Sequence, residues 1–198
     1  MMGILDYGMG NIGSVSYAFG RIGVKSAVVK SAAQVSKCSG LVIPGVGAFG
    51  PAMRRLSLLK PALGEFVALG KPLLGICLGM QVLFEEGSEG GRCNGLGLIG
   101  GKVEKIKGAP KLPQVGWNTV EITAASPLFD GVASGEYFYF VHSYACKPES
   151  KGCVLAAAEY GERFACAVGK ENVFGVQFHP EKSGAAGERL LQNFARMT

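Results

Sequence analysis

The 198-residue sequence is poor in the residues that build metal sites, since it has only two histidines and its six cysteines form no Cys-x-x-Cys pair. Neither histidine stands at zinc-ligand spacing from a cysteine, which excludes a structural zinc site and favours reduced thiols. No apolar run approaches the ~18 residues of a membrane helix. The first residues also lack the basic and apolar regions of a signal peptide. We therefore expect a cytoplasmic protein with no metal, no other cofactor and no membrane partner.

Long runs of one charge are also absent, although the net charge is +5. The densest cluster consists of Lys102, Lys105, Lys107 and Lys111, interrupted by Glu104. It lacks the interleaved aromatic residues of nucleic-acid-binding surfaces, which argues against a nucleic-acid partner. A solvated sheet edge or hairpin is the favoured interpretation, and docking on an acidic partner is the alternative.

The hydrophobic fraction of 48% is enough for one well-buried domain over residues 1–198, whereas two domains would be cramped. Through residue 86, apolar runs alternate with helical patterns, which predicts an α/β fold with a central, mainly parallel sheet flanked by helices. After residue 87, shorter runs predict an additional smaller antiparallel or mixed sheet and a closing helix at 184–197. The predicted strands are 3–5, 25–29, 40–44, 73–76, 102–106, 119–122, 136–141, 153–159, 164–168 and 173–177, and the other predicted helices are 11–21, 48–56 and 58–69.

Cys77 lies between a predicted strand and a helical pattern, with Gly75 two residues before it and Gly79 two residues after it. The glycines suit a turn so tight that a Cβ on either side would clash. A nucleophile in such a turn is typical of a nucleophile elbow. The turn also places Cys77 near a helix N-terminus, where the dipole and free amides stabilise a thiolate. The alternative is that Cys77 is a small buried hydrophobe.

His179 ends the last predicted strand and is followed by Pro180 and Glu181. The proline biases His179 toward an extended conformation, in which residues i and i+2 point the same way. Glu181 can therefore bind one imidazole nitrogen and leave the other free, as the orienting acid and the base of a triad do. The alternative for His179 is a structural histidine. His142 is the competing base, but its neighbours suit a pocket wall better.

Two glycine-rich stretches also follow predicted strands. Residues 8–13 match G-x-G-x-x-G, but Lys30 follows the next strand where a dinucleotide site would need an acid, so an NAD site is disfavoured. The loop at 44–50 can bring backbone amides close to a ligand. Ligands of open α/β sheets bind beyond the carboxyl ends of the strands, so both stretches and Cys77 are expected to share one rim.

The motifs Gly-Ile-Cys77-Leu-Gly-Met-Gln81 and Gln-Phe-His179-Pro-Glu181 resemble those of the class I (triad) glutamine amidotransferases. The resemblance covers essentially the whole chain and narrows to the glutaminase subunits of imidazole glycerol phosphate synthase, from histidine biosynthesis. The loop at 44–49 departs from the Pro-Gly-Gly more usual in the class. The stretches that narrow the resemblance are 6–11, 44–49, 113–118 and 139–144.

The resemblance implies a flavodoxin-like amidotransferase fold and the hydrolysis of glutamine to glutamate and ammonia. Cys77 would attack the side-chain amide, His179 would transfer the proton, Glu181 would orient His179, and water would cleave the γ-glutamyl thioester. The elbow geometry makes the Leu78 amide one oxyanion donor, and the family implies a second donor from the segment Gly45, Val46 and Gly47. The implied glutamine-binding residues are Gln81, Ser143 and Tyr144, with a surface helical role as the alternative for Gln81.

The resemblance also implies a heterodimer with a (β/α)₈-barrel cyclase, through which ammonia would pass. The cyclase would make imidazole glycerol phosphate and an aminoimidazole carboxamide ribotide. Plausible interface residues are Asn11, Pro113, Trp117 and Lys182. Trp117 suits an interface anchor, with a core position as the alternative. Lys182 directly follows Glu181, so a salt bridge at Lys182 would couple docking to the triad.

Other functions remain open at this point. The glutaminase of pyridoxal phosphate synthase is disfavoured because its expected Pro-Gly-Gly-Glu-Ser loop is absent. A γ-glutamyl or peptide hydrolase that acts alone is a further alternative. Another is a catalytically silent regulatory subunit, which the complete set of Cys77, His179 and Glu181 disfavours. We also hypothesise that the loop 44–47 forms a poor oxyanion hole until partner and acceptor bind, because the glycines beside Val46 allow a peptide to flip.

Overall fold

A computed structural model describes all residues from 1 to 198. The strands are β1 (Met2–Leu5), β2 (Ser26–Val29), β3 (Gly40–Gly45), β4 (Leu73–Cys77), β5 (Phe84–Gly87), β6 (Cys93–Asn94), β7 (Ile99–Lys105), β8 (Gln114–Ile122), β9 (Glu136–His142), β10 (Tyr144–Pro148), β11 (Val154–Tyr160), β12 (Glu162–Lys170) and β13 (Val173–Val176). The helices are α1 (Ile12–Arg21), α2 (Ala32–Val35), α3 (Phe49–Leu56), α4 (Lys60–Ala68), α5 (Leu78–Gln81) and α6 (Gly184–Arg196). None of the helices combines the length and the hydrophobicity that crossing a membrane requires.

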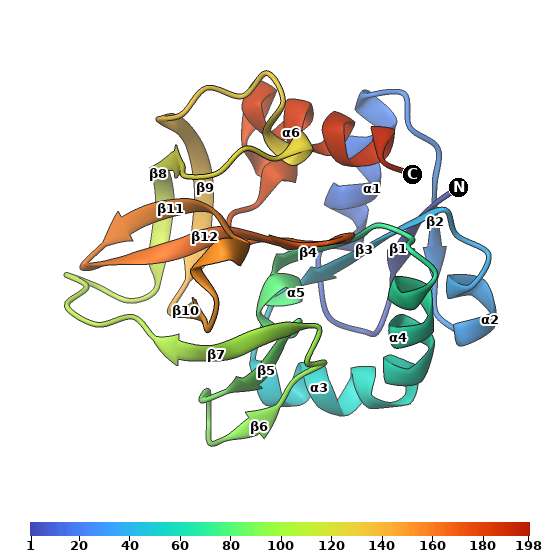
Figure 1. The fold of residues 1–198 in the computed structure, drawn as a ribbon, viewed down its shortest axis with the longest axis horizontal. Coiled ribbons are helices and arrows are strands. Elements are labelled where there is room, and N and C mark those ends of the chain that lie inside the picture. Colours follow the sequence, from blue (N-terminus) through green and yellow to red (C-terminus); the bar gives the residue numbers. More distant parts are fainter.

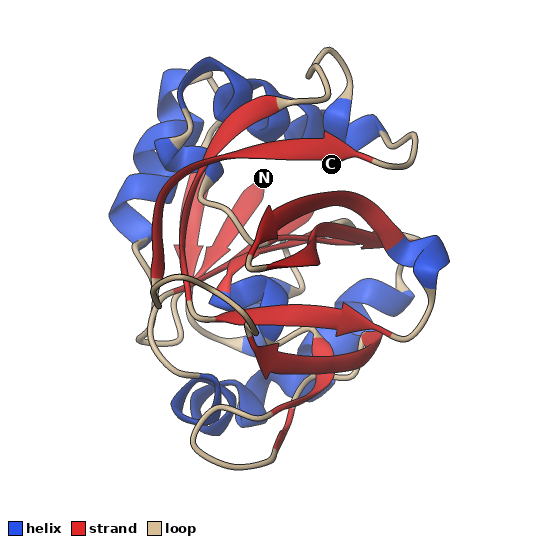
Figure 2. Ribbon diagram, turned by 90° about the vertical axis from the view of Figure 1, so that its left-hand side faces the viewer, coloured by secondary structure: helices blue, strands red, loops and turns tan.

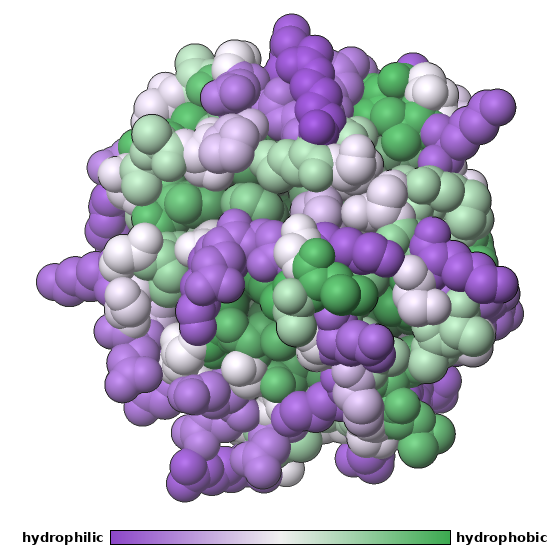
Figure 3. All heavy atoms as spheres, turned by 45° about the vertical axis from the view of Figure 1, so that its right-hand side comes forward, coloured by the Kyte–Doolittle hydropathy of each residue, from purple (hydrophilic) through white to green (hydrophobic).

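Strands β2, β1, β3, β4 and β13 form the parallel half of the sheet, in that order. Helices α1 and α6 cover one face of this half, and α2, α3 and α4 cover the other (Figure 1). Alternating side chains of β4 belong to two hydrophobic clusters. Ile76 lies in the cluster that contains Phe19 and Phe194, and Leu73 lies in the cluster that contains Leu63. On the side of the molecule shown in Figure 3, polar and apolar residues are interspersed. The parallel α/β half predicted from the sequence is confirmed.

The second half is antiparallel except for the parallel pair of β5 and β7, and it continues the first without a break, because β13 pairs with β4 on one side and with β12 on the other. The sheet then runs through β10, β7, β5 and β6, and a branch from β12 leads through β11 and β8 to β9. Figure 2 looks onto this half and shows mostly strands in front. The smaller sheet predicted from the sequence is thus joined to the main one and forms a single mixed sheet with it.

Several boundaries differ from the predicted ones. Strand β8 begins at Gln114 rather than at 119, although Gly116 has a positive φ of 137° within it. Strand β10 and the short pair β5 and β6 were not predicted, since β6 has two residues and β10 ends on a proline. The cap predicted for the first helix is present, because the Asn11 side chain accepts a hydrogen bond from the Ser14 amide at 3.2 Å.

Candidate active site

Cys77 occupies a sharp turn between β4 and α5, with φ 54° and ψ −112°. A Cβ at Gly75 would lie 2.4 Å from the Gly79 carbonyl oxygen, and a Cβ at Gly79 would lie 1.8 Å from the Ile43 carbonyl oxygen. Only glycine fits at both places. The strained backbone holds the Cys77 thiol at the start of α5, as the glycine spacing predicts.

His179 follows β13, the strand that lies parallel to β4, so the imidazole and the thiol meet at the carboxyl ends of neighbouring strands. Its Nδ1 lies 2.8 Å from Oε1 of Glu181, and the two side chains are 4% and 1% exposed. Burial alone lowers the pKa of His179, but the interactions with Cys77 and Glu181 outweigh it and raise the pKa to about 10. The imidazole is therefore charged at neutral pH and carries a proton that it can give to a leaving group.

A ring of three hydrogen bonds fixes the backbone around His179. Its amide donates to the Tyr139 carbonyl at 2.8 Å, the Ser183 hydroxyl donates to the His179 carbonyl at 2.6 Å, and the Tyr139 amide donates to the Ser183 hydroxyl at 3.0 Å. The base is thus tied to β9, whose Val141 carbonyl lies 3.6 Å from the Cys77 sulfur. Strand β9 consequently contacts both sides of the candidate catalytic pair.

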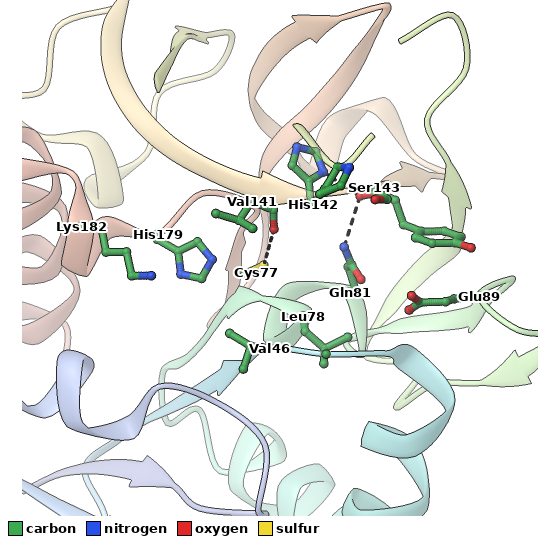
Figure 4. Close-up of a pocket in the computed structure, with 13 residues that line it drawn as sticks. Val46, Cys77, Leu78, Gln81, Glu89, Val141, His142, Ser143, His179 and Lys182 are labelled. Atoms are coloured by element: carbon green, nitrogen blue, oxygen red, sulfur yellow. Dashed lines mark hydrogen bonds between the residues drawn. The ribbon is translucent and has the colours of Figure 1, made fainter. Parts of the chain in front are cut away.

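The pair opens into a cavity of about 270 Å³ (Figure 4). All the predicted oxyanion and substrate residues line it except Gly45, which is buried behind the wall and paired with Cys77 in the β3–β4 ladder. Pro113 and Lys182 reach the cavity rim as well. The lining residues are Val46, Gly47, Cys77, Leu78, Gln81, Glu89, Pro113, Val141, His142, Ser143, Tyr144, His179 and Lys182.

Gln81 is 5% exposed, so the surface role considered for it is wrong. Its amide nitrogen donates to the Tyr144 carbonyl at 3.2 Å and to the Gln177 side-chain oxygen at 3.0 Å. Gln177 in turn points its amide nitrogen at the Cys77 sulfur, 3.6 Å away. With its donor group used within the protein, Gln81 offers a ligand its carbonyl oxygen and holds Tyr144 in place.

Glu89 lines the cavity although nothing in the sequence singled it out. It is the only carboxylate in the lining, and its Oε2 accepts a hydrogen bond from the Phe49 amide, the first residue of α3, at 2.9 Å. Figure 4 shows it on the same side of the cavity as Gln81 and Ser143. A fixed carboxylate there can bind the ammonium group of an amino acid.

His142 is part of the wall, as predicted, and is unsuited to act as a base. Its Nδ1 lies 2.8 Å from the Tyr144 carbonyl oxygen, and its Nε2 lies 2.9 Å from the Gln114 side-chain amide. Burial lowers its pKa to about 4, against the opposing effect of the Tyr144 carbonyl. The atom of Gln114 nearest Nε2 is its Oε1, so each ring nitrogen faces an oxygen within hydrogen-bond distance and neither nitrogen is free for a substrate.

Of the predicted interface residues, Pro113 and Lys182 line the cavity, and Asn11 and Trp117 are exposed at the surface. Trp117 is 56% exposed on β8, which excludes a core position, and it meets Tyr139 edge to face at 6.0 Å. Glu181 turns inward to His179, whereas the Lys182 ammonium lies 5.8 Å from the centre of the Tyr139 ring. Asn11 is exposed, and its side chain caps α1.

Residues 3–197 match the model of the family described as "Glutamine amidotransferase class-I". The imidazole glycerol phosphate synthase subunit HisH of Methanocaldococcus jannaschii is 44% identical over 197 residues, with all of both chains covered. That of Symbiobacterium thermophilum is 47% identical over 196 residues, with 98% of this chain and 92% of the relative covered.

Solved structures of low sequence identity share the fold. PurLQS from Thermotoga maritima is 18% identical with a TM-score of 0.80, and 98% of this chain and 97% of that chain are covered. The crystal structure of a glutamine amidotransferase is 20% identical with a TM-score of 0.77, and 99% of this chain and 97% of that chain are covered. The match over residues 3–197 and the relatives that are 44% and 47% identical over nearly the whole chain show that the chain belongs to the class I glutamine amidotransferase family.

Proposed function

We propose that the chain is the glutaminase subunit of an imidazole glycerol phosphate synthase and supplies ammonia for histidine biosynthesis. The observation that carries the proposal is the buried set of Cys77, His179 and Glu181 opening into one cavity. It is supported by relatives named as this subunit over the full length of the chain. Six free cysteines support a reducing, cytoplasmic setting.

In the proposed reaction, the substrate glutamine places its α-ammonium group on Glu89 and its carboxamide over Cys77. Ser143 and Tyr144 hold the rest of the amino acid. Both carry backbone groups on the cavity wall, which Gln81 fixes at Tyr144. Cys77 and Glu89 both line this cavity, and Figure 4 shows Gln81 between them.

The Cys77 thiolate attacks the carboxamide carbon, and the carbonyl oxygen becomes an oxyanion. His179, charged through its raised pKa, gives its proton to the nitrogen that leaves as ammonia. Water, deprotonated by the now neutral His179, then cleaves the γ-glutamyl thioester to release glutamate. Glu181 keeps the imidazole oriented throughout, through the 2.8 Å contact with Nδ1.

The proposed partner is a (β/α)₈-barrel cyclase bound as a heterodimer at the cavity mouth. The apolar face of β8 and β9 supports this location. It carries Val115, Trp117 and Tyr137, each more than half exposed, and borders Lys182. Exposed aromatic residues next to a charged one are typical of an interface anchor.

Steady-state glutamate release tests the proposal, measured for the chain alone, with the cyclase, and with the cyclase and its acceptor ligand. We expect low activity of the isolated chain and a rise on each addition, because a glutaminase that works without its partner wastes glutamine. Full activity of the isolated chain would contradict the proposed dependence on the partner. Absence of glutamate release in the complete mixture would contradict the function itself.

A further inference from the structure

Tyr7 carries a hydroxyl that is buried without a hydrogen-bond partner. The residue follows β1 and is 7% exposed. Burial raises the pKa of its phenol, and negative charge at Cys77 adds to the effect, so the hydroxyl stays a neutral donor at physiological pH. Buried donors without a partner are rare in folded proteins because they lose the hydrogen bonds that water would give them. Such a group points to a partner that the site supplies in another arrangement.

The hydroxyl lies where the oxyanion segment passes the elbow. A Cβ on Gly45 would lie 2.7 Å from the Tyr7 hydroxyl oxygen, 2.8 Å from the Gly79 amide nitrogen and 2.8 Å from Cβ of Leu78. Glycine at position 45 therefore leaves open the space between the hydroxyl and the backbone, which any other side chain would fill. Gly45, the first residue of the segment 45–47, therefore lies directly beside the hydroxyl.

The register of β3 and β4 determines where the Gly45 carbonyl points. Leu41 donates its amide to the Pro72 carbonyl at 3.0 Å, and in a parallel ladder every second residue faces the same neighbouring strand. Gly45 is four residues after Leu41, so its peptide groups also face β4, where it pairs with Cys77. In a parallel ladder, the carbonyl of such a residue is directed toward the amide of the residue after its partner. That residue is Leu78, whose amide is the proposed first oxyanion donor. The carbonyl must turn away before this amide can bind an oxyanion.

We propose that Tyr7 is a positioning residue of the site, whose hydroxyl donates to the Gly45 carbonyl when the segment 45–47 rearranges for catalysis. The proposal rests on the glutaminase function. The N–H and C=O of a trans peptide point in opposite directions, so a rotation that turns the Val46 amide into the cavity turns the Gly45 carbonyl out of it. Gly47, at φ 109°, gives the segment the freedom to rotate. Tyr7 stabilises the active arrangement, in which the Leu78 and Val46 amides both face the oxyanion.

The variant Tyr7→Phe tests the proposal, because it keeps the ring and removes only the hydroxyl. With cyclase and acceptor bound, we expect kcat for glutamate release to fall about tenfold and KM to stay within twofold, as the loss of one hydrogen bond made in the active arrangement requires. The rate at which iodoacetamide alkylates Cys77 should not change, since that displacement forms no oxyanion. The Tm of the isolated chain should stay equal or rise, because the hydroxyl has no partner there.

Tyr160→Phe is the matched control, since it removes a hydroxyl that donates to the Lys111 carbonyl at 2.9 Å outside the cavity. It should lower the Tm and leave kcat unchanged. Parental kcat in Tyr7→Phe would overturn the proposal, and so would an equal fall in the alkylation rate, which would place the action of Tyr7 on the thiol. A parent complex that releases no glutamate would instead refute the glutaminase function, so the two failures are distinguishable.

Discussion

Both histidines are buried and line one cavity, yet their pKa values shift in opposite directions. That of His179 rises to about 10 because Cys77 and Glu181 outweigh burial. That of His142 falls to about 4 because burial dominates, and its ring faces only a carbonyl and an amide. The comparison teaches that the partners of a buried imidazole, and not burial alone, decide whether it holds a proton at neutral pH.

The largest effect is expected from Cys77→Ala, which removes one of the two groups that hold the proton on His179. Glutamate release should fall by roughly 10⁴-fold or more, as for loss of a catalytic nucleophile. The pKa of His179, followed by NMR of the imidazole, should fall. Cys93→Ala, at a half-exposed thiol outside the cavity, is the control that should keep full activity. An unchanged His179 pKa in Cys77→Ala would break the comparison.

A smaller effect is expected from Glu181→Gln, because the amide still binds the ring but no longer stabilises its charge. We expect kcat to fall by up to roughly 10⁴-fold, the loss seen when a triad acid becomes an amide. The pKa of His179 should fall toward that of His142. Glu188→Gln on α6, which pairs with Arg21 at the surface, should change neither quantity. Retained activity in Glu181→Gln would show that Glu181 does not orient the base.

His142→Phe should act on stability more than on chemistry. It leaves the Tyr144 carbonyl and the Gln114 amide unpaired, and we expect a loss of about 1–3 kcal/mol in the free energy of unfolding. His142→Asn, whose amide can still donate to Tyr144, should lose less. Urea unfolding measures both. A pH–rate profile that loses a limb in His142→Asn would show that His142, and not His179 alone, takes part in proton transfer.

The last effect is on the pH dependence of stability, to which the two histidines contribute in opposite pH ranges. The folded pKa of His179, about 10, is above its ordinary 6.5, so its contribution is complete below pH 6.5 and is lost as the pH rises toward 10. The folded pKa of His142, about 4, is below 6.5, so its contribution is complete above pH 6.5 and is lost as the pH falls through 4. Urea unfolding across this range should show both losses, and Cys77→Ala should weaken the alkaline one.

The sequence predicted the parts of the site that depend on local backbone geometry. Gly75 and Gly79 predict the elbow because no other residue fits the turn. Pro180 predicts an extended backbone at His179 because a proline restricts the conformation of the residue before it. The parallel half of the sheet followed from the alternation of apolar runs with helical patterns. In each case the constraint lies within a few residues of the feature that it predicts.

The remaining parts depend on contacts between distant segments. Glu89 enters the cavity only because the turn after β5 reaches the start of α3, and no local pattern marks that approach. The different directions of Glu181 and Lys182 have the same origin, since adjacency in sequence does not reveal that Glu181 turns inward and Lys182 toward Tyr139. The start of β8 was missed because Gly116 interrupts the strand pattern although pairing with β9 continues through it.

The insertion of β13 between β4 and β12 has a consequence for the order of events during synthesis. Cys77 and the strand that brings its base are separated by about a hundred residues of chain, so a ribosome completes the elbow long before the base exists. Until then the thiol has no proton acceptor, and β4 presents an open edge to other chains. Reactivity toward glutamine therefore begins only when the last strand docks, and a chain that stops short of β13 is both inert and prone to aggregate.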